Sequence, residues 1–212
     1  MFPLGTVLLP GGVLPLHVFE PRYREMVVHC LDNGREFGVV LIERGNEVGG
    51  GDMRRDIATV ARMVQVAELA DGRFAMITVG MRRIRVLSWL DDAPYPRAVV
   101  QDWDDSEFVD SDAGCSSLKA LSSRVRRLVA LAVELGDSAD DPSQDLSDDP
   151  VAAVYQLATL APLGPADRYS LLATAGFTDR VELFHRLLDD AEETLMFRLN
   201  AGDTSSDPPT TW

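Results

Sequence analysis

One pair of residues has the spacing of a nucleophile and its base. Ser116 and Lys119 fit the SxxK pattern, in which one helical turn brings a lysine amine beneath a serine hydroxyl. The SDN and KTG companions of such hydrolases are absent from the sequence. Leu118 also begins an apolar helical stripe. We therefore interpret Ser116 as a helix N-cap and Lys119 as a solvated side chain, and we assign no catalytic residue.

The sequence does not predict a metal site. Its soft ligands are few and scattered: His17, His29, His185, Cys30 and Cys115. His29 and Cys30 are adjacent on a predicted helix and point about 100° apart, which suits a tetrahedral site poorly. We expect Cys30 to lie in the core. We expect His17, between Leu16 and Val18, to hydrogen-bond to that helix.

The sequence also lacks a loop of the kind that cradles a nucleotide phosphate. The GxxxxGK[ST] motif is absent. Glycines cluster at positions 45, 49, 50 and 51, but they do not have the GxGxxG spacing, and no helix start follows them. We interpret this cluster as a hairpin loop and expect no cofactor.

The net charge of −14 is concentrated in the second half of the chain. Residues 1–100 carry 12 basic and 12 acidic side chains, whereas residues 101–212 carry 8 and 22. Such a field repels phosphate backbones, so the charge disfavours nucleic acid as a partner. No run approaches the roughly 18 apolar residues of a membrane span, and no secretory signal is visible. We expect a soluble cytoplasmic protein without a membrane partner; its oligomeric state stays open.

The elements that would position any site begin with a strand followed at once by a helix. An apolar run ends at Glu20, and Pro21 suits the first position of a helix. An apolar stripe at helical spacing follows: Tyr23, Met26, Val27, Cys30 and Leu31. Asn33-Gly34 predicts the end of the helix. We interpret the charged residues of this turn as an ion-pair network: Glu20, Arg22, Arg24 and Glu25.

The remaining pattern divides the chain into a strand-rich part and a helical part. Short apolar runs broken by turns, with a hairpin signal at Asp71-Gly72, predict a small barrel. Four apolar helical stripes follow, one of them beginning at Asp149-Pro150. The predicted fold class is α+β, a β-barrel with one early helix followed by a C-terminal helical bundle. The predicted bounds are 1–110 for the barrel subdomain, 111–199 for the bundle and 200–212 for a disordered tail.

Several sequence blocks stand in a recognisable order. They are Pro15, His17, Phe19, Glu20, Pro21, Arg22 and Tyr23, with residues 2–4 and 9–12 before them and 37–42, 56–62, 71–73, 80–86 and 162–167 after them. In this order they resemble the N-terminal substrate-binding domain of the Lon protease family, over about residues 1–199. Ala58 stands where the family pattern has Gly. The resemblance implies a PUA-like barrel and a role in selecting polypeptides, especially unfolded or exposed apolar segments.

The enzymatic parts of that family have no counterpart in the sequence. Its ATPase needs a phosphate-cradling loop and its protease a separate serine and lysine, and Lys119 is the only lysine here. We therefore expect a non-enzymatic protein or peptide recognition module that works without those domains. One alternative is a PUA-like small-molecule or RNA-binding protein, and another is a hydrolase acting alone.

Four aromatic residues are candidates for a partner-binding surface, although each is also a good core residue: Phe2, Tyr23, Phe74 and Trp89. A groove beside the barrel could accept an extended segment by strand addition. Arg82, Arg83 and Arg85 either receive an acidic partner or form a solvated strand face, and we favour the solvated face.

Overall fold

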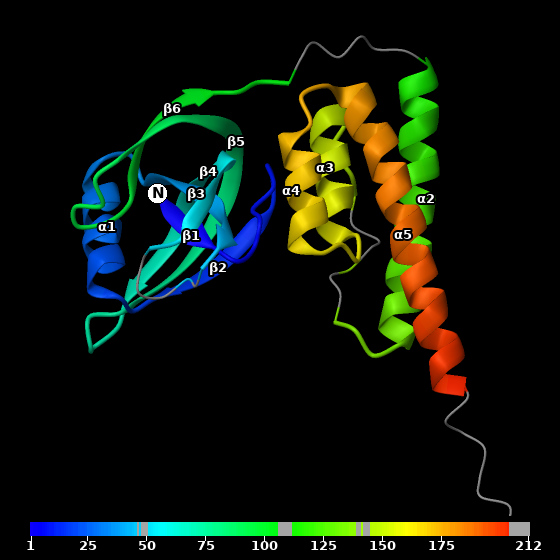
Figure 1. Ribbon diagram of the computed structural model, residues 1–212, viewed down its shortest axis with the longest axis horizontal. Coiled ribbons are helices and arrows are strands. Elements are labelled where there is room, and N and C mark those ends of the chain that lie inside the picture. The colour runs from blue at the N-terminus through cyan, green and yellow to red at the C-terminus, as the bar shows by residue number, and fades with distance from the viewer. Residues whose placement is uncertain (46, 48–50, 106–111, 139–140, 142–144, 204–212) are drawn as a thin grey trace, which may run out of the picture.

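The computed structural model describes residues 1–45, 47, 51–105, 112–138, 141 and 145–203. Six strands and one helix come first, and four helices follow (Figure 1). The first group comprises β1 (Phe2–Leu4), β2 (Val13–Val18), α1 (Pro21–Asp32), β3 (Glu36–Arg44), β4 (Met53–Glu68), β5 (Phe74–Leu90) and β6 (Arg97–Asp102). The second group comprises α2 (Asp112–Glu134), α3 (Pro150–Leu160), α4 (Pro165–Ala173) and α5 (Phe177–Asp203). The α+β class is confirmed.

The strands form one mixed sheet in the order β1-β3-β4-β5-β2, with β6 also paired to β5. β1 runs parallel to β3, and the other pairs are antiparallel. β2 pairs with the first half of β5 and β6 with its second half. Register shifts along β4 and β5 mark bulges, which bend strands.

The barrel expected from the sequence is not closed among the described strands, because no pair joins β1 to β2 or β6. One cause is that β2 and β6 follow each other along a single edge of β5, where a closing strand would pair. A hydrogen bond still joins the two sides. The amino group of Met1 donates to the Pro96 carbonyl at 2.7 Å, joining the start of β1 to the segment before β6.

Helix α1 begins at Pro21, as the sequence predicts. Its predicted stripe faces the sheet: Tyr23, Met26 and Val27 are buried, and Cys30 and Leu31 pack at the margin of the same core. Glu20 pairs with Arg22 at 3.1 Å, which confirms part of the expected ion-pair network. Figure 1 shows α1 at the side of the sheet away from the other helices. Its opposite face is therefore left to solvent.

The four later helices share a second apolar core. α3 begins at Pro150, and Asp149 caps it by accepting hydrogen bonds from the backbone of Val151 and Ala152. The long helices α2 and α5 lie side by side (Figure 1). They run parallel, because Arg124, Arg127 and then Asp137 pair with successively later residues of α5: Asp189, Glu192 and Arg198. Among the described residues, none of the helices is both long and apolar enough for a membrane span.

The sheet and the helices meet at a buried polar cluster. Arg83 of β5 donates to Asp105 at 2.6 Å and to the carbonyls of Leu172 and Thr174 at 2.8 Å each. Arg180 of α5 donates to Asp105 as well, and to the same Thr174 carbonyl at 2.6 Å. Both arginines are buried. This cluster fixes the helices to the sheet through charge-assisted hydrogen bonds.

The predicted subdomain bounds at 110 and 111 fall on residues outside the described ranges. α5 continues through Asp203, so residues 200–203 are helical, whereas the sequence placed them in the tail. The division into two subdomains and the tail beyond residue 203 stay predictions.

Candidate functional site

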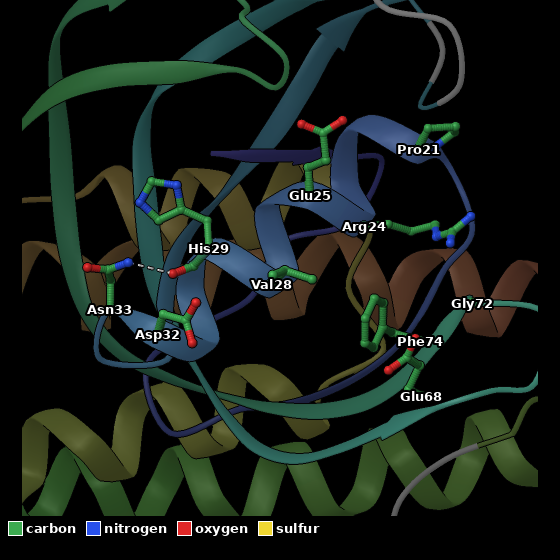
Figure 2. Close-up of a pocket in the computed structure, with 10 residues that line it drawn as sticks. All are labelled: Pro21, Arg24, Glu25, Val28, His29, Asp32, Asn33, Glu68, Gly72 and Phe74. Atoms are coloured by element: carbon green, nitrogen blue, oxygen red, sulfur yellow. Dashed lines mark hydrogen bonds between the residues drawn. The ribbon is translucent and has the colours of Figure 1, made fainter.

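The candidate site is a groove of about 730 Å³ between α1 and the turn that joins β4 to β5. Figure 2 shows its side chains coming from both elements. The helix contributes Pro21, Arg24, Glu25, Val28, His29 and Asp32, Asn33 follows it, and the strands and their turn contribute Glu68, Gly72 and Phe74. The helical residues recur at intervals of three and four, so they form the face of α1 opposite its buried stripe.

The apolar surface of the groove has one buried and one exposed part. Phe74 is 5% exposed and belongs to the core beneath α1. Val28 is 52% exposed, although it lies in the middle of a helix. Val28 therefore offers an apolar contact on the concave surface, of the kind that lines ligand pockets.

The turn that forms the other wall depends on a glycine. Gly72 has φ +76°, a left-handed conformation that favours glycine, and its amide donates to the Leu69 carbonyl at 2.8 Å. Arg24 reaches across the groove to this turn. A Cβ atom on residue 72 would overlap the Arg24 Nη2 atom. The absence of a side chain at Gly72 therefore lets the guanidinium lie against the backbone of the turn.

Hydrogen bonds hold His29 at the far end of the groove. Its Nδ1 atom lies 2.9 Å from the Tyr95 hydroxyl. Its backbone carbonyl accepts from Asn33 Nδ2 at 2.8 Å (Figure 2). Burial raises the pKa of Tyr95, so this phenol stays protonated at neutral pH. The Tyr95 contact holds the ring of His29, and the Asn33 contact holds its backbone.

The electrostatic character of the groove is acidic. Glu25, Asp32 and Glu68 contribute three carboxylates, and Arg24 contributes the only guanidinium among the lining residues. An acidic wall attracts lysine and arginine side chains and repels phosphate groups. Three carboxylates beside one guanidinium therefore leave the groove with a net negative charge.

The structure separates the four aromatic candidates. Phe2 and Tyr23 are buried against each other with ring centroids 4.4 Å apart. Phe74 shares their core and also lines the groove. Trp89 packs in a different cluster, with the Arg54 guanidinium 4.8 Å from its ring centre. Only Phe74 is brought to the groove, and partner contact by any of the four stays a prediction.

Two sequence expectations are wrong. His17 does not hydrogen-bond to α1 within the described residues. It is exposed on β2, because strand alternation turns Leu16 and Val18 inward and His17 outward.

The solvated strand face expected for Arg82, Arg83 and Arg85 is wrong for Arg83. This side chain is buried in the cluster with Asp105. The side chain of Ser116 lies outside the described residues.

Two further cavities lie between the sheet and the helices. One of about 750 Å³ is bounded by Arg55 and Tyr169, whose hydroxyl donates to Asp56 at 2.9 Å. The other, of about 260 Å³, reaches Arg83 and Tyr155. The Tyr155 hydroxyl is buried and has no hydrogen-bond partner among the residues that the structure describes, and burial raises its pKa to about 12. Within the described ranges no cluster of histidine, cysteine and carboxylate side chains could hold a metal ion.

Sequence reasoning missed most of the groove, although part of the signal was present. Arg24, Val28 and Asp32 repeat at helical spacing on the face opposite the predicted core stripe. Val28 is the apolar residue of that otherwise polar face. The contribution of Glu68 and Gly72 depends on how the hairpin folds toward α1, which no local pattern encodes.

The comparisons with known proteins agree with this architecture. Residues 1–190 match the family model described as the ATP-dependent protease La (LON) substrate-binding domain. Lon protease 2 of Myxococcus xanthus is 29% identical over 200 residues, and the Lon protease of Anaeromyxobacter dehalogenans is 27% identical over the same length. Each alignment covers 90% of this chain but only 23% of the relative, so the chain spans about a quarter of those proteases.

Two solved structures have the same fold. The Lon N-terminal domain protein from Xanthomonas campestris superposes with a TM-score of 0.61 and 26% identity, covering 85% of this chain and 92% of that one. The N-terminal domain of the Mycobacterium avium complex Lon protease gives a TM-score of 0.57 at 21% identity, covering 89% and 97%, and it shows the fold alone. With the family model matching nearly its whole length, the chain belongs to the Lon substrate-binding domain family.

Proposed function

We propose that this chain is a non-enzymatic recognition module that binds unfolded or exposed apolar polypeptide segments in the groove between α1 and the β4–β5 turn. The observation that carries the proposal is Val28, exposed beside a groove whose floor is the core residue Phe74. The family's description as a substrate-binding domain supports the same class of partner. The groove volume lies within the range of about 300–1,000 Å³ typical of binding pockets.

An unpaired strand edge next to the groove supports an extended ligand. β2 pairs with β5 alone among the described strands, so no described strand covers its other edge. Val18, the last residue of β2, pairs with Phe74 of the groove. Phe19 follows it and is exposed. An extended segment on β2 would gain backbone hydrogen bonds and place side chains toward the groove.

The charge of the groove favours segments that carry basic residues beside apolar ones. Glu25, Asp32 and Glu68 surround the exposed Val28, and the chain as a whole carries −14. Long cationic side chains can place their apolar stems on Val28 and their charged ends near the carboxylates. The same charges oppose the RNA-binding alternative, since RNA affinity depends largely on cationic contacts.

Fluorescence anisotropy with defined probes tests the proposal. The probes are a labelled apolar peptide flanked by lysines, the same peptide flanked by glutamates, and a labelled single-stranded RNA. We expect the lysine-flanked peptide to bind more tightly than the glutamate-flanked one, and the RNA to show no shift at about 50 mM salt, where electrostatic binding is strong. Binding of RNA alone, or of neither peptide, would overturn the proposal.

A further inference from the structure

Three residues on one line along α1 present charges in a fixed order. Arg24, Val28 and Asp32 are four residues apart, and all three line the groove. Side chains at this spacing lie one above another on a helix, about 6 Å apart along its axis. The line thus presents a cation, an apolar side chain and an anion in succession. A ligand that matches it has an anion at one end, then an apolar side chain, then a cation.

The guanidinium of Arg24 has no partner within the described chain. Its side chain makes no hydrogen bond or ion pair there, although Glu25 and Glu68 line the same groove. Other arginines at the surface do pair with carboxylates: Arg62 pairs with Glu36 at 2.6 Å, and Arg73 pairs with Asp71 at 2.7 Å. Among the described residues, the donors of Arg24 are therefore left for a ligand in the groove.

The position of Arg24 favours the end of a chain over its middle. The side chain begins on α1, and its guanidinium lies against the turn at Gly72 (Figure 2). It therefore runs from one wall of the groove to the other, across the path of a segment that follows α1. A carboxylate side chain in the middle of a segment would require the segment to pass this obstacle. A carboxyl terminus would not, and a guanidinium can donate two parallel hydrogen bonds to it.

We propose that the groove takes the carboxyl-terminal end of a polypeptide, with the terminal carboxylate on Arg24. The inference rests on the proposed peptide binding, and it adds which part of the polypeptide is recognised and in which direction. The bound segment runs toward the start of α1. Its earlier residues therefore lie beside Val28 and Asp32, where the groove is apolar and then acidic.

The spacing along α1 gives the order of residues in such an end. Side chains on one face of an extended segment are about 6.6 Å apart, close to the interval of about 6 Å from Val28 to Asp32. With the terminal carboxylate on Arg24, the second residue from the end lies near Val28 and the fourth lies near Asp32. The matching end therefore has a basic residue in fourth place and an apolar residue in second place, counted from the carboxyl terminus.

Fluorescence anisotropy with two forms of one peptide tests the inference. Both forms carry a label at the amino end, a lysine fourth from the carboxyl end and a leucine second from it. One form ends in a free carboxylate and the other in an amide. The wild type should bind the free acid about tenfold more tightly, because charge-assisted hydrogen bonds are among the stronger polar contacts.

Two arginine variants assign this preference to its residue. Arg24→Gln should bind the acid and the amide equally. Arg73→Gln is the matched control, since it removes the same charge from the neighbouring turn, where Arg73 does not line the groove. It should keep the wild-type preference. Circular dichroism confirms that both variants are folded.

A third peptide tests the direction of binding. In this free acid the lysine is moved to third place from the end, which points it to the opposite face of the segment, away from Asp32. It should bind the wild type about threefold more weakly, as expected for one lost exposed ion pair. Equal binding of the two lysine positions would overturn the proposed direction.

The outcomes separate this inference from the peptide binding on which it rests. If the wild type binds none of the peptides, the proposed function fails and the inference fails with it. If the wild type binds the acid and the amide equally, the inference alone is overturned. A preference for the acid that persists in Arg24→Gln, or that is lost in Arg73→Gln, would also overturn it.

Discussion

Arg83 of β5 and Arg180 of α5 donate hydrogen bonds to the same carboxylate oxygen, Oδ1 of Asp105. They also share the carbonyl of Thr174, just after α4. The ring centre of Trp103 lies 4.4 Å from Cζ of Arg83, and the ring centre of Tyr155 lies 4.6 Å from Cζ of Arg180. Two buried cations thus share one carboxylate where the sheet meets the helices.

Asp105→Asn should destabilise the protein strongly. It leaves two buried guanidinium groups without a countercharge, a change that typically costs about 3–5 kcal/mol in the free energy of unfolding. Urea denaturation followed by circular dichroism measures the loss. Asp104→Asn is the matched control, because Asp104 is exposed, and it should change the free energy of unfolding by no more than about 0.5 kcal/mol. Equal losses in the two variants would contradict the role given to Asp105.

Gly72→Ala tests the contact between the β4–β5 turn and Arg24. The substitution forces a Cβ into a left-handed conformation, at a cost of about 1–2 kcal/mol, and displaces Arg24 as well. Gly34→Ala is the matched control, since Gly34 has φ +89° and nothing within 4 Å of the added Cβ.

Urea denaturation should show a larger loss in the free energy of unfolding for Gly72→Ala than for Gly34→Ala. Arg24→Ala in the Gly72→Ala background should remove the excess, because the obstructing side chain is then gone. If the excess persists without Arg24, the guanidinium does not lie against the turn as described.

Glu36 makes a pH-dependent contribution to the free energy of unfolding, and this contribution is stabilising at neutral pH. Hydrogen bonds from Arg82 and Arg62 hold the pKa of this carboxyl below its usual 4.5. A lowered folded-state pKa stabilises the protein above the unfolded pKa, and the stabilisation is lost as pH falls through the folded value. Glu36→Gln should therefore cost up to about 1 kcal/mol near neutrality, the range for exposed pairs.

The difference in the free energy of unfolding between the wild type and Glu36→Gln should shrink as pH falls below 4.5. Parallel denaturation series at several pH values measure it, and the other carboxyl groups cancel in the comparison. A difference that stays constant across the acid range would refute the assignment.

Local signals predicted α1 well because they act within a few residues. Pro21 sets the start, the spacing of Tyr23, Met26 and Val27 sets the buried face, and Gly34 permits the end. The cap at Asp149 followed the same logic. The family resemblance, carried by the same first segment, also proved correct.

Long-range relationships were not predictable in this way. Arg83 looked solvated because strand alternation does not show that its acceptors come from Leu172 and Thr174, far along the chain. The open sheet follows from β2 and β6 sharing one edge of β5, a topological fact absent from either strand's sequence. The groove was not predictable from either segment alone, because its walls come from α1 and from the β4–β5 hairpin.

The exposed Val28 is the residue that tests the central claim most directly. Val28→Asp adds a carboxylate to the apolar part of the groove, whereas Val133→Asp makes the same change on α2. The two valines are 52% and 51% exposed, so neither substitution removes a buried side chain. Unfolding experiments should confirm that both variants remain folded.

The measurement is the dissociation constant of the labelled lysine-flanked apolar peptide for the wild type and both variants, at a salt concentration that screens long-range attraction. Loss of the apolar contact at Val28 should weaken binding about tenfold, the equivalent of about 1.4 kcal/mol. Val133→Asp should bind as the wild type does. Equal affinity of all three proteins, or a loss confined to Val133→Asp, would contradict the assignment of the groove as the binding site.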